Sequence, residues 1–156
     1  KERTSAEVAK AVVTGLAESG VMSDAVDSAG LQLQPVITDH LVLITPDGHR
    51  LSRGGSKTFA DVLNEPYVGL APGSALQDQV DEHARNVGKM MRFRIRMNTL
   101  GGVCEMVSQG VGVSIVPMNI VKRYGRQHPC RKVPLSDAWC RRRLCLCFRD
   151  WKALSA

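Results

Sequence analysis

Residues 99–117 (TLGGVCEMVSQGVGVSIVP) constrain the fold most, because they specify a helix, a stop and a strand in immediate succession. Thr99 is a preferred N-cap residue, and three apolar residues follow it at the spacing of one helical face. Gly110 supplies the left-handed conformation that ends helices. The mainly β-branched run 113–116 then ends at Pro117, which cannot continue a ladder. This succession predicts a helix packed on a buried sheet, whose strands we expect to be parallel.

Two further helices are predicted to begin after hydroxyl residues. Thr4, Ser5 and Glu7 have the form of one N-terminal cap, and Ser74 with Gln77 has the form of a second capping box. Apolar residues recur along both segments at helical spacing. The residues expected to be buried are Val8, Val12 and Leu16 on the first helix, and Leu76, Val80, Ala84 and Val87 on the second.

Apolar runs rich in β-branched residues predict strands between these helices. The predicted strands are residues 21–22, 36–45, 67–70, 92–97, 132–135 and 144–148. In residues 92–97, arginines alternate with apolar residues, as in a strand with one wet face. Alternation of strands and helices favours an α/β fold with right-handed crossovers.

The hydroxyl-capped helix starts suggest where a ligand would bind. In α/β sheets the helices that follow strands begin at the carboxyl ends of those strands, which is where ligands bind. The free N–H groups and the dipole of a helix start favour an anion there. We therefore expect a binding crevice beside Thr4 and Ser5, Ser74 and Thr99.

Charge is distributed unevenly along the chain. Of its 21 Lys and Arg residues, 14 lie in residues 89–156, together with only 3 of its 15 Asp and Glu. A basic half is one sign of nucleic-acid binding. However, the chain has only seven Phe, Trp and Tyr residues to stack on bases. Solvated strand faces explain the charge better than direct contact with nucleic acid does.

The sequence shows no motif typical of catalysis or of metal or cofactor binding. The sequence contains no phosphate-binding GxxxxGK[ST] motif and no HExxH, and its four histidines are scattered. We predict no catalytic residue, no metal site and no cofactor. Five cysteines, an odd number without a CxxC spacing, favour a reduced cytoplasmic protein. A redox pair of Cys130 with Cys140, or a metal site, stays open.

Two motifs resemble a known family. Residues 39–51 have the pattern D-x-LVL-xx-P-x-x-H-x-L, and residues 106–117 have the pattern MV-xx-G-V-G-V-xx-VP. Together with FADVLNEPYVGLAPGSALQ at residues 59–77, and in this order, they resemble the effector-binding domain of LysR-type transcriptional regulators. The resemblance spans nearly the whole chain.

The resemblance implies an α/β fold of the periplasmic-binding-protein-like type 2: two α/β lobes joined by two crossover strands, with a small, anionic metabolite bound between them. The crossovers would be residues 41–44 and 144–148. Lobe one would comprise residues 1–40 and 149–156, and lobe two residues 41–148 including the crossover strands. The effector-binding residues implied by the family are Thr4, Ser5, Leu70, Ala71, Pro72, Gly73, Ser74, Asn98, Thr99, Val116 and Pro117.

The resemblance also implies partners. Members of the family form homodimers or homotetramers and bind DNA through a helix-turn-helix domain, which we expect to be absent from this chain. By the same resemblance, we expect the first strand–helix unit of lobe one and most of the last helix to be absent as well. We expect a cytoplasmic protein without a membrane association. A solute-binding protein of the same fold is the main alternative, and an enzyme on related lobes or a cysteine redox sensor are others.

Overall fold

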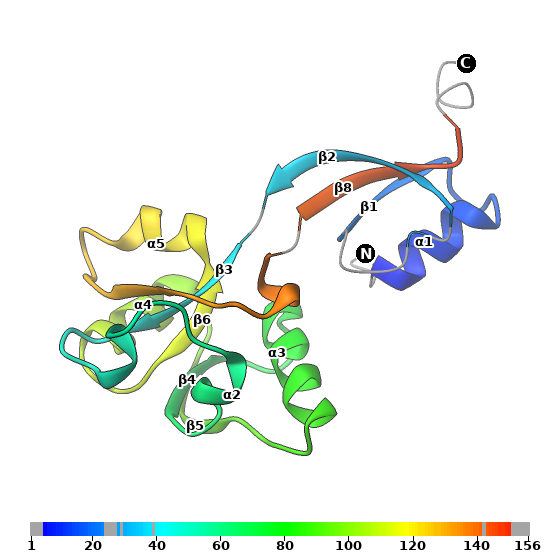
Figure 1. The fold of residues 1–156 in the computed structure, drawn as a ribbon. Helices are drawn as coiled ribbons and strands as arrows, with labels where there is room; N and C mark the ends of the chain where they lie inside the picture. Colours follow the sequence, from blue (N-terminus) through cyan, green and yellow to red (C-terminus); the bar gives the residue numbers. More distant parts are fainter. Residues whose placement is uncertain (1–4, 24–27, 29, 39, 142, 151–156) are drawn as a thin grey trace. The chain divides into compact units, whose positions relative to one another are not determined.

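The computed structural model describes residues 5–23, 28, 30–38, 40–141 and 143–150 (Figure 1). The chain divides into two units: unit 1 comprises Lys1–His40 and Arg141–Ala156, and unit 2 comprises Leu41–Cys140. Among the described residues, no helix has the length and apolar character needed to cross a membrane.

Unit 1 is a three-stranded antiparallel sheet with one helix. Its strands lie in the order β1 (Ser19–Ser23), β8 (Arg143–Phe148) and β2 (Gln32–Thr38), and α1 (Ser5–Val13) contacts β1 and β8 (Figure 1). Val12 of α1 packs with Met22 and Cys147 of the sheet in a small apolar core.

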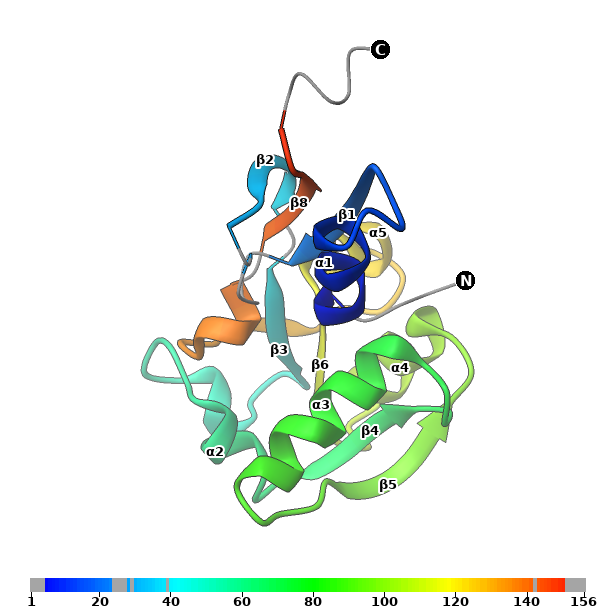
Figure 2. The ribbon, with the colours of Figure 1, turned by 90° about the vertical axis from the view of Figure 1, so that its right-hand side faces the viewer.

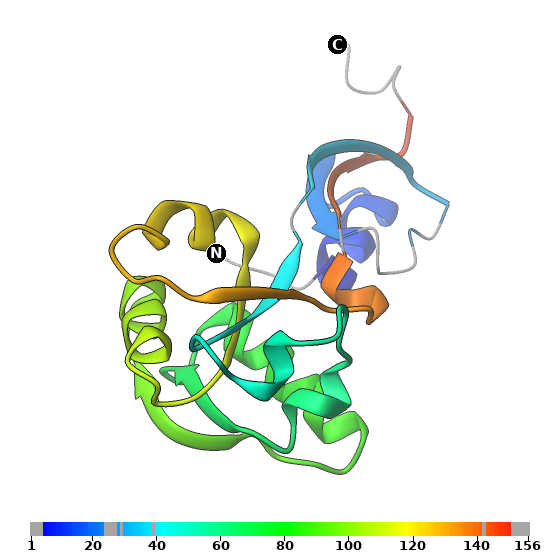
Figure 3. The same cartoon turned by 60° about the vertical axis from the view of Figure 1, so that its left-hand side comes forward.

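Unit 2 contains two adjoining sheets. In the first, β3 (Leu41–Thr45) pairs antiparallel with β6 (Ser114–Pro117) on one side and with β7 (Arg131–Pro134) on the other (Figure 3). In the second, β4 (Pro66–Leu70) pairs parallel with β5 (Arg92–Met97). A parallel bridge between Tyr67 and Val113 joins β4 to the residue that precedes β6. The carboxyl ends of β4, β5 and β6 therefore lie at one edge.

Helices cover both faces of these sheets. Alternate residues of β3 enter different cores: Leu43 packs with residues of α2 (Phe59–Val62) and α3 (Ala75–Asn86), whereas Ile44 packs with residues of α4 (Leu100–Ser108) and α5 (Met118–Tyr124). This follows from the alternation of side chains along a strand. Figure 2 shows α3 lying along β4. Two short 3₁₀ helices, η1 (Arg50–Ser52) and η2 (Ala138–Arg141), complete the elements.

A buried carboxylate connects two loops of unit 2. Glu65 accepts a hydrogen bond from the guanidinium of Arg50, and His49 lies beside its other oxygen, with Nε2 3.3 Å from Oε2. The other ring nitrogen of His49, Nδ1, accepts a hydrogen bond from Leu51 N at 3.1 Å. Because Nδ1 accepts, the ring proton lies on Nε2 and points to Glu65. The histidine of the first family motif thus links η1 to the start of β4.

Several local expectations were wrong. The run 36–45 forms two strands, β2 and β3, rather than one. The first helix ends at Val13, so Leu16 lies beyond the helical stripe and is 85% exposed. Val87 follows the last residue of α3 and is exposed for the same reason.

The expectation of a parallel sheet was partly wrong. The partner strand of β6 is β3, which runs antiparallel to it, and the parallel pair is β4 with β5. Strand β5 was expected to have one wet face, but Phe93 and Ile95 on the other face are 36% and 37% exposed. Within the described residues β4 is the only strand paired with β5, which therefore lies at the edge of its sheet.

The lobe boundaries differ from the expected ones at residues 141–148. We expected this segment in lobe two, but β8 pairs with β1 and β2 and belongs to unit 1. The chain thus passes from one unit to the other at 40–41 and again at 140–141. Of the two expected crossovers, residues 41–44 lie in β3 of unit 2 and residues 144–148 lie in β8 of unit 1.

Candidate ligand-binding pocket

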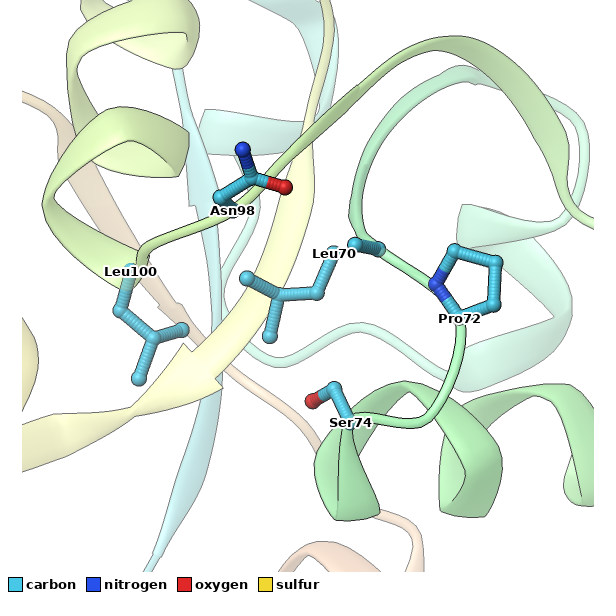
Figure 4. Close-up of a pocket in the computed structure, with 6 residues that line it drawn as sticks. Leu70, Pro72, Ser74, Asn98 and Leu100 are labelled. Atoms are coloured by element: carbon cyan, nitrogen blue, oxygen red, sulfur yellow. The ribbon is translucent and has the colours of Figure 1, made fainter.

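A hollow of about 450 Å³ opens where β4 and β5 end and α3 and α4 begin; we call it the β4–β5 pocket. Its lining residues come from the end of β4, the start of α4 and the two loops that connect each strand to the next helix (Figure 4). They are Leu70, Ala71, Pro72, Ser74, Asn98 and Leu100. In Figure 4 the side chain of Leu70 lies between the amide of Asn98 and the hydroxyl of Ser74. The carboxyl edge of parallel strands is the expected place for a ligand in an α/β protein.

Ser74 begins α3 and is one of the polar groups of the pocket. Its backbone is extended, and its hydroxyl accepts a hydrogen bond from Gln77 N at 3.5 Å. The side chain of Gln77 does not return to Ser74, so the expected capping box is only half formed. It points instead to Leu70 N, which donates to Gln77 Oε1 at 2.9 Å. This contact between α3 and β4 replaces the local one.

Thr99 begins α4 in the predicted way. Its hydroxyl accepts a hydrogen bond from Gly102 N at 3.0 Å, and its carbonyl accepts from Val103 N at 3.1 Å. As an acceptor, the hydroxyl of Thr99 serves its own helix, and its neighbours Asn98 and Leu100 line the pocket.

One backbone hydrogen bond joins the two pocket loops. Ala71 N donates to Met97 O at 2.9 Å, so the loop after β4 is held to the end of β5. Gly73 has a φ of +92°, which an L side chain rarely adopts, and this allows the chain to turn from Pro72 into α3. The two helix starts are thereby held on opposite sides of one hollow.

The chemistry of the pocket suits a small anion. None of its six lining residues carries a charge, and Ser74 and Asn98 supply a hydroxyl and a side-chain amide. The first amides of any helix have no partner within the helix, and the helix dipole adds partial positive charge there. Two helices of 12 and 9 residues begin at this pocket. The arrangement can bind a carboxylate-sized anion, whereas none of its lining side chains is a general acid or base.

The predicted effector-binding residues lie in three places. Five of them line the pocket, and Gly73 and Thr99 lie between lining residues. Val116 is buried in β6 opposite Val42, and Pro117 precedes α5 at the same sheet edge. Ser5 begins α1 in unit 1, and Thr4 lies outside the described residues.

Two residues at the pocket were missed by sequence reasoning. Leu100 was assigned to the buried stripe of α4, yet it both packs against the core and lines the pocket. Gln77 was interpreted as a capping residue. Its contact with Leu70 spans seven residues and could not be read from local spacing.

In the described part of the chain, none of the five cysteines forms a disulfide. Cys130, one member of the redox pair considered above, has its Sγ 3.5 Å from Cys104 O and packs beside the core of α4, whereas Cys140 is part of the core on the opposite face. Burial, and then the neighbouring Cys104, raise the pKa of Cys130 to about 11. Burial also raises the pKa of Cys104 and of Cys147. Such thiols are weakly nucleophilic at neutral pH.

The pocket thus lies in an α/β unit, and comparison with known proteins identifies the family. The family model described as "LysR substrate binding domain" matches residues 1–156. The chain belongs to this family. It is 33% identical over 97 residues to the regulatory protein NocR of Agrobacterium tumefaciens, a match that covers 62% of this chain and 32% of NocR. The chain therefore spans about a third of that relative.

Solved structures with low sequence identity share the fold. The regulatory domain of CcmR from Synechocystis PCC6803, in complex with 2-PG, superposes with a TM-score of 0.64 at 14% identity, over 95% of this chain and 71% of that one. The effector-binding domain of BenM with its effector benzoate superposes with a TM-score of 0.61 at 15% identity, over 96% of this chain and 68% of that one. These matches confirm the expected type 2 periplasmic-binding-protein-like fold.

Proposed function

We propose that this chain is the effector-sensing part of a LysR-type transcriptional regulator and that it binds a small organic anion in the β4–β5 pocket. The observation that carries this proposal is the convergence of the starts of α3 and α4 on one uncharged hollow. An anion there would interact with helix amides rather than with a Lys or Arg. The relatives BenM and CcmR, which hold benzoate and 2-PG, support a ligand of this class.

A regulatory role follows from differential binding. A ligand that binds one arrangement of a protein better than another shifts the population toward it, and the shift is limited by the difference in affinity. We propose that such a shift controls a DNA-binding domain elsewhere in the full-length regulator, in the cytoplasm. Thr4 and Ser5 of unit 1, and Val116 and Pro117 of β6, stay predictions as further effector contacts.

Binding rather than catalysis is supported by the pocket. Its six lining residues include no carboxylate, Lys or His that could act as an acid or base. The curated relatives that match are described as regulators. These matches therefore favour a regulatory function over that of a solute-binding protein.

We also propose that the chain associates with itself. The edge strand β5 presents Phe93 and Ile95, and the preceding Met90 is exposed as well. Unpaired edge strands with apolar side chains are ready to pair with another chain. A homodimer would cover this surface. Light scattering of the purified chain and of an Ile95→Lys variant tests this, and a monomeric wild-type protein would contradict it.

Titration of the isotope-labelled chain with benzoate, followed by NMR, tests the ligand site. We expect chemical-shift changes at residues 70–74 and 98–100, saturating with benzoate concentration. Asn98→Ala removes an exposed amide of the pocket and should raise the Kd about threefold to tenfold, because one hydrogen bond to an anion is lost.

The matched control is Asn119→Ala, which removes an exposed amide from α5. It should leave the Kd unchanged. If benzoate does not perturb the two pocket loops, the proposed anion site is wrong.

A further inference from the structure

Gln77 is a buried polar side chain whose amide contacts Leu70, a lining residue of the β4–β5 pocket. It is 2% exposed and sits in the first turn of α3. Its Oε1 accepts from Leu70 N at 2.9 Å, and its Nε2 donates to Asp81 Oδ1 at 2.9 Å. We call this chain of contacts from Asp81 through Gln77 to Leu70 the Gln77 bridge.

The orientation of the Gln77 amide follows from its two partners. A backbone N–H such as that of Leu70 can only donate, and an ionised carboxylate such as that of Asp81 can only accept. Only an amide, with one acceptor and one donor end, satisfies both at once. A buried polar group that lost either partner would carry the cost of desolvation without compensation.

Leu70 is also held through its backbone carbonyl oxygen. Arg96 Nε donates to Leu70 O at 2.8 Å, and the guanidinium lies over the ring of Phe93, 4.3 Å from its centroid. Gly69 makes room for both arrangements: a Cβ there would lie 2.3 Å from Phe93 Cε1 and 3.0 Å from Gln77 Oε1. Both backbone polar groups of Leu70 are therefore committed to side chains of neighbouring elements.

We propose that Gln77 is the positioning residue of the β4–β5 pocket. The Gln77 bridge holds the loop of Leu70 to Ser74 at a constant distance from α3, so that Ser74 and the first amides of the helix converge on the same anion. That the ligand is an anion rests on the function proposed above. The positioning of the pocket loop rests only on the contacts of Gln77.

Three variants separate the bridge from simple packing. Gln77→Glu keeps the size of the side chain and still accepts from Leu70 N, but it sets a second carboxylate against Asp81, and like charges repel. Asp81→Asn removes that charge and can still accept from the Gln77 amide. In the double variant Gln77→Glu/Asp81→Asn, the new amide at position 81 can donate to the new carboxylate, so every contact is restored with the roles of the two groups exchanged.

The first readout needs no ligand. Amide hydrogen exchange, measured by NMR on the 156-residue chain, reports the opening of the pocket loop at Leu70 N. We expect exchange at Leu70 to be at least about tenfold faster in Gln77→Glu and to return to the wild-type rate in the double variant. Asp81→Asn alone should leave it near the wild-type rate. Exchange at Leu43, in the centre of unit 2, should be the same in all variants.

The second readout is the Kd for benzoate. It should rise at least about threefold in Gln77→Glu and recover in the double variant. The control for added charge is Gln127→Glu, at an exposed position after α5, which should change neither quantity.

Each outcome decides something. Unchanged exchange at Leu70 in Gln77→Glu, or equal acceleration at Leu70 and Leu43, would overturn the positioning role, because the second result means only a loss of global stability. A double variant that folds but does not recover would also overturn it. If the exchange results are as expected but wild-type protein does not bind benzoate, the positioning role is supported and the ligand class of the proposed function is wrong.

Discussion

Thr99 is the residue at which a structural role and a binding role are most easily confused. It was predicted to contact the effector, but its hydroxyl accepts the hydrogen bond of Gly102 N that begins α4. Thr99→Val has nearly the same shape and cannot accept that bond. Loss of an N-cap costs about 1 kcal/mol of the free energy of unfolding, which corresponds to a fall in Tm of about 2–4 °C.

Thr99→Asp separates the two roles. A carboxylate caps a helix as well as a hydroxyl does and interacts favourably with the helix dipole, so stability should equal or exceed that of the wild type. The same charge would repel an anion in the pocket next to it. Two like charges roughly 8 Å apart at an effective dielectric of about 40–80 repel by about 0.5–1 kcal/mol, or about twofold to fivefold in Kd.

The assay combines urea unfolding followed by circular dichroism with benzoate titration followed by NMR. Thr99→Val should lose stability, Thr99→Ser should keep it, and Thr99→Asp should keep it while weakening benzoate binding. An unchanged free energy of unfolding in Thr99→Val would refute the capping argument. Benzoate binding as tight in Thr99→Asp as in the wild type would refute the location of the anion.

Three further predictions concern the core of unit 2. Burial raises the pKa of Tyr67 from 10.0 to about 12, so its contribution to stability is present below pH 10 and is lost as pH rises toward 12. The free energy of unfolding should fall by roughly 2–3 kcal/mol over that range, and Tyr67→Phe should lack this fall. Glu65→Gln should cost about 1–2 kcal/mol in urea unfolding, because the neutral amide loses the carboxylate's ion pair with Arg50 and its contact with His49. Gly112→Ala should cost about 1–3 kcal/mol by the same measurement, since its Cβ would lie 2.5 Å from a backbone oxygen of β4.

A specific experimental result would contradict each of these three predictions. If the free energy of unfolding falls as steeply between pH 10 and pH 12 in Tyr67→Phe as in the wild type, groups other than Tyr67 cause the fall. Wild-type stability in Glu65→Gln would mean that water replaces the buried carboxylate contacts. A Gly112→Ala protein of undiminished stability would mean that β4 moves freely away from the bridge at Val113.

The features that local sequence determined are those that depend on neighbours a few residues away. The cap at Thr99 and the left-handed Gly110 depend on residues within one turn, and the structure has both as expected. The family motifs likewise identified the fold, because residues 39–51 and 106–117 supply the central strands β3 and β6. The loops that line the pocket were also predicted, since they follow from the positions of strand ends and helix caps.

Tertiary structure alone decided the features that depend on contacts between residues far apart in the sequence. Leu16 is exposed because α1 stops at Val13, and β6 runs antiparallel to its partner because β3, far away in sequence, is that partner. In a capping box the side chain of Gln77 would accept from Ser74 N, but that amide donates to Ala71 O at 3.4 Å. A buried backbone N–H without a partner is costly, so the amide of Gln77 binds Leu70 N instead. No local pattern records that preference, because it depends on which groups the completed fold excludes from water.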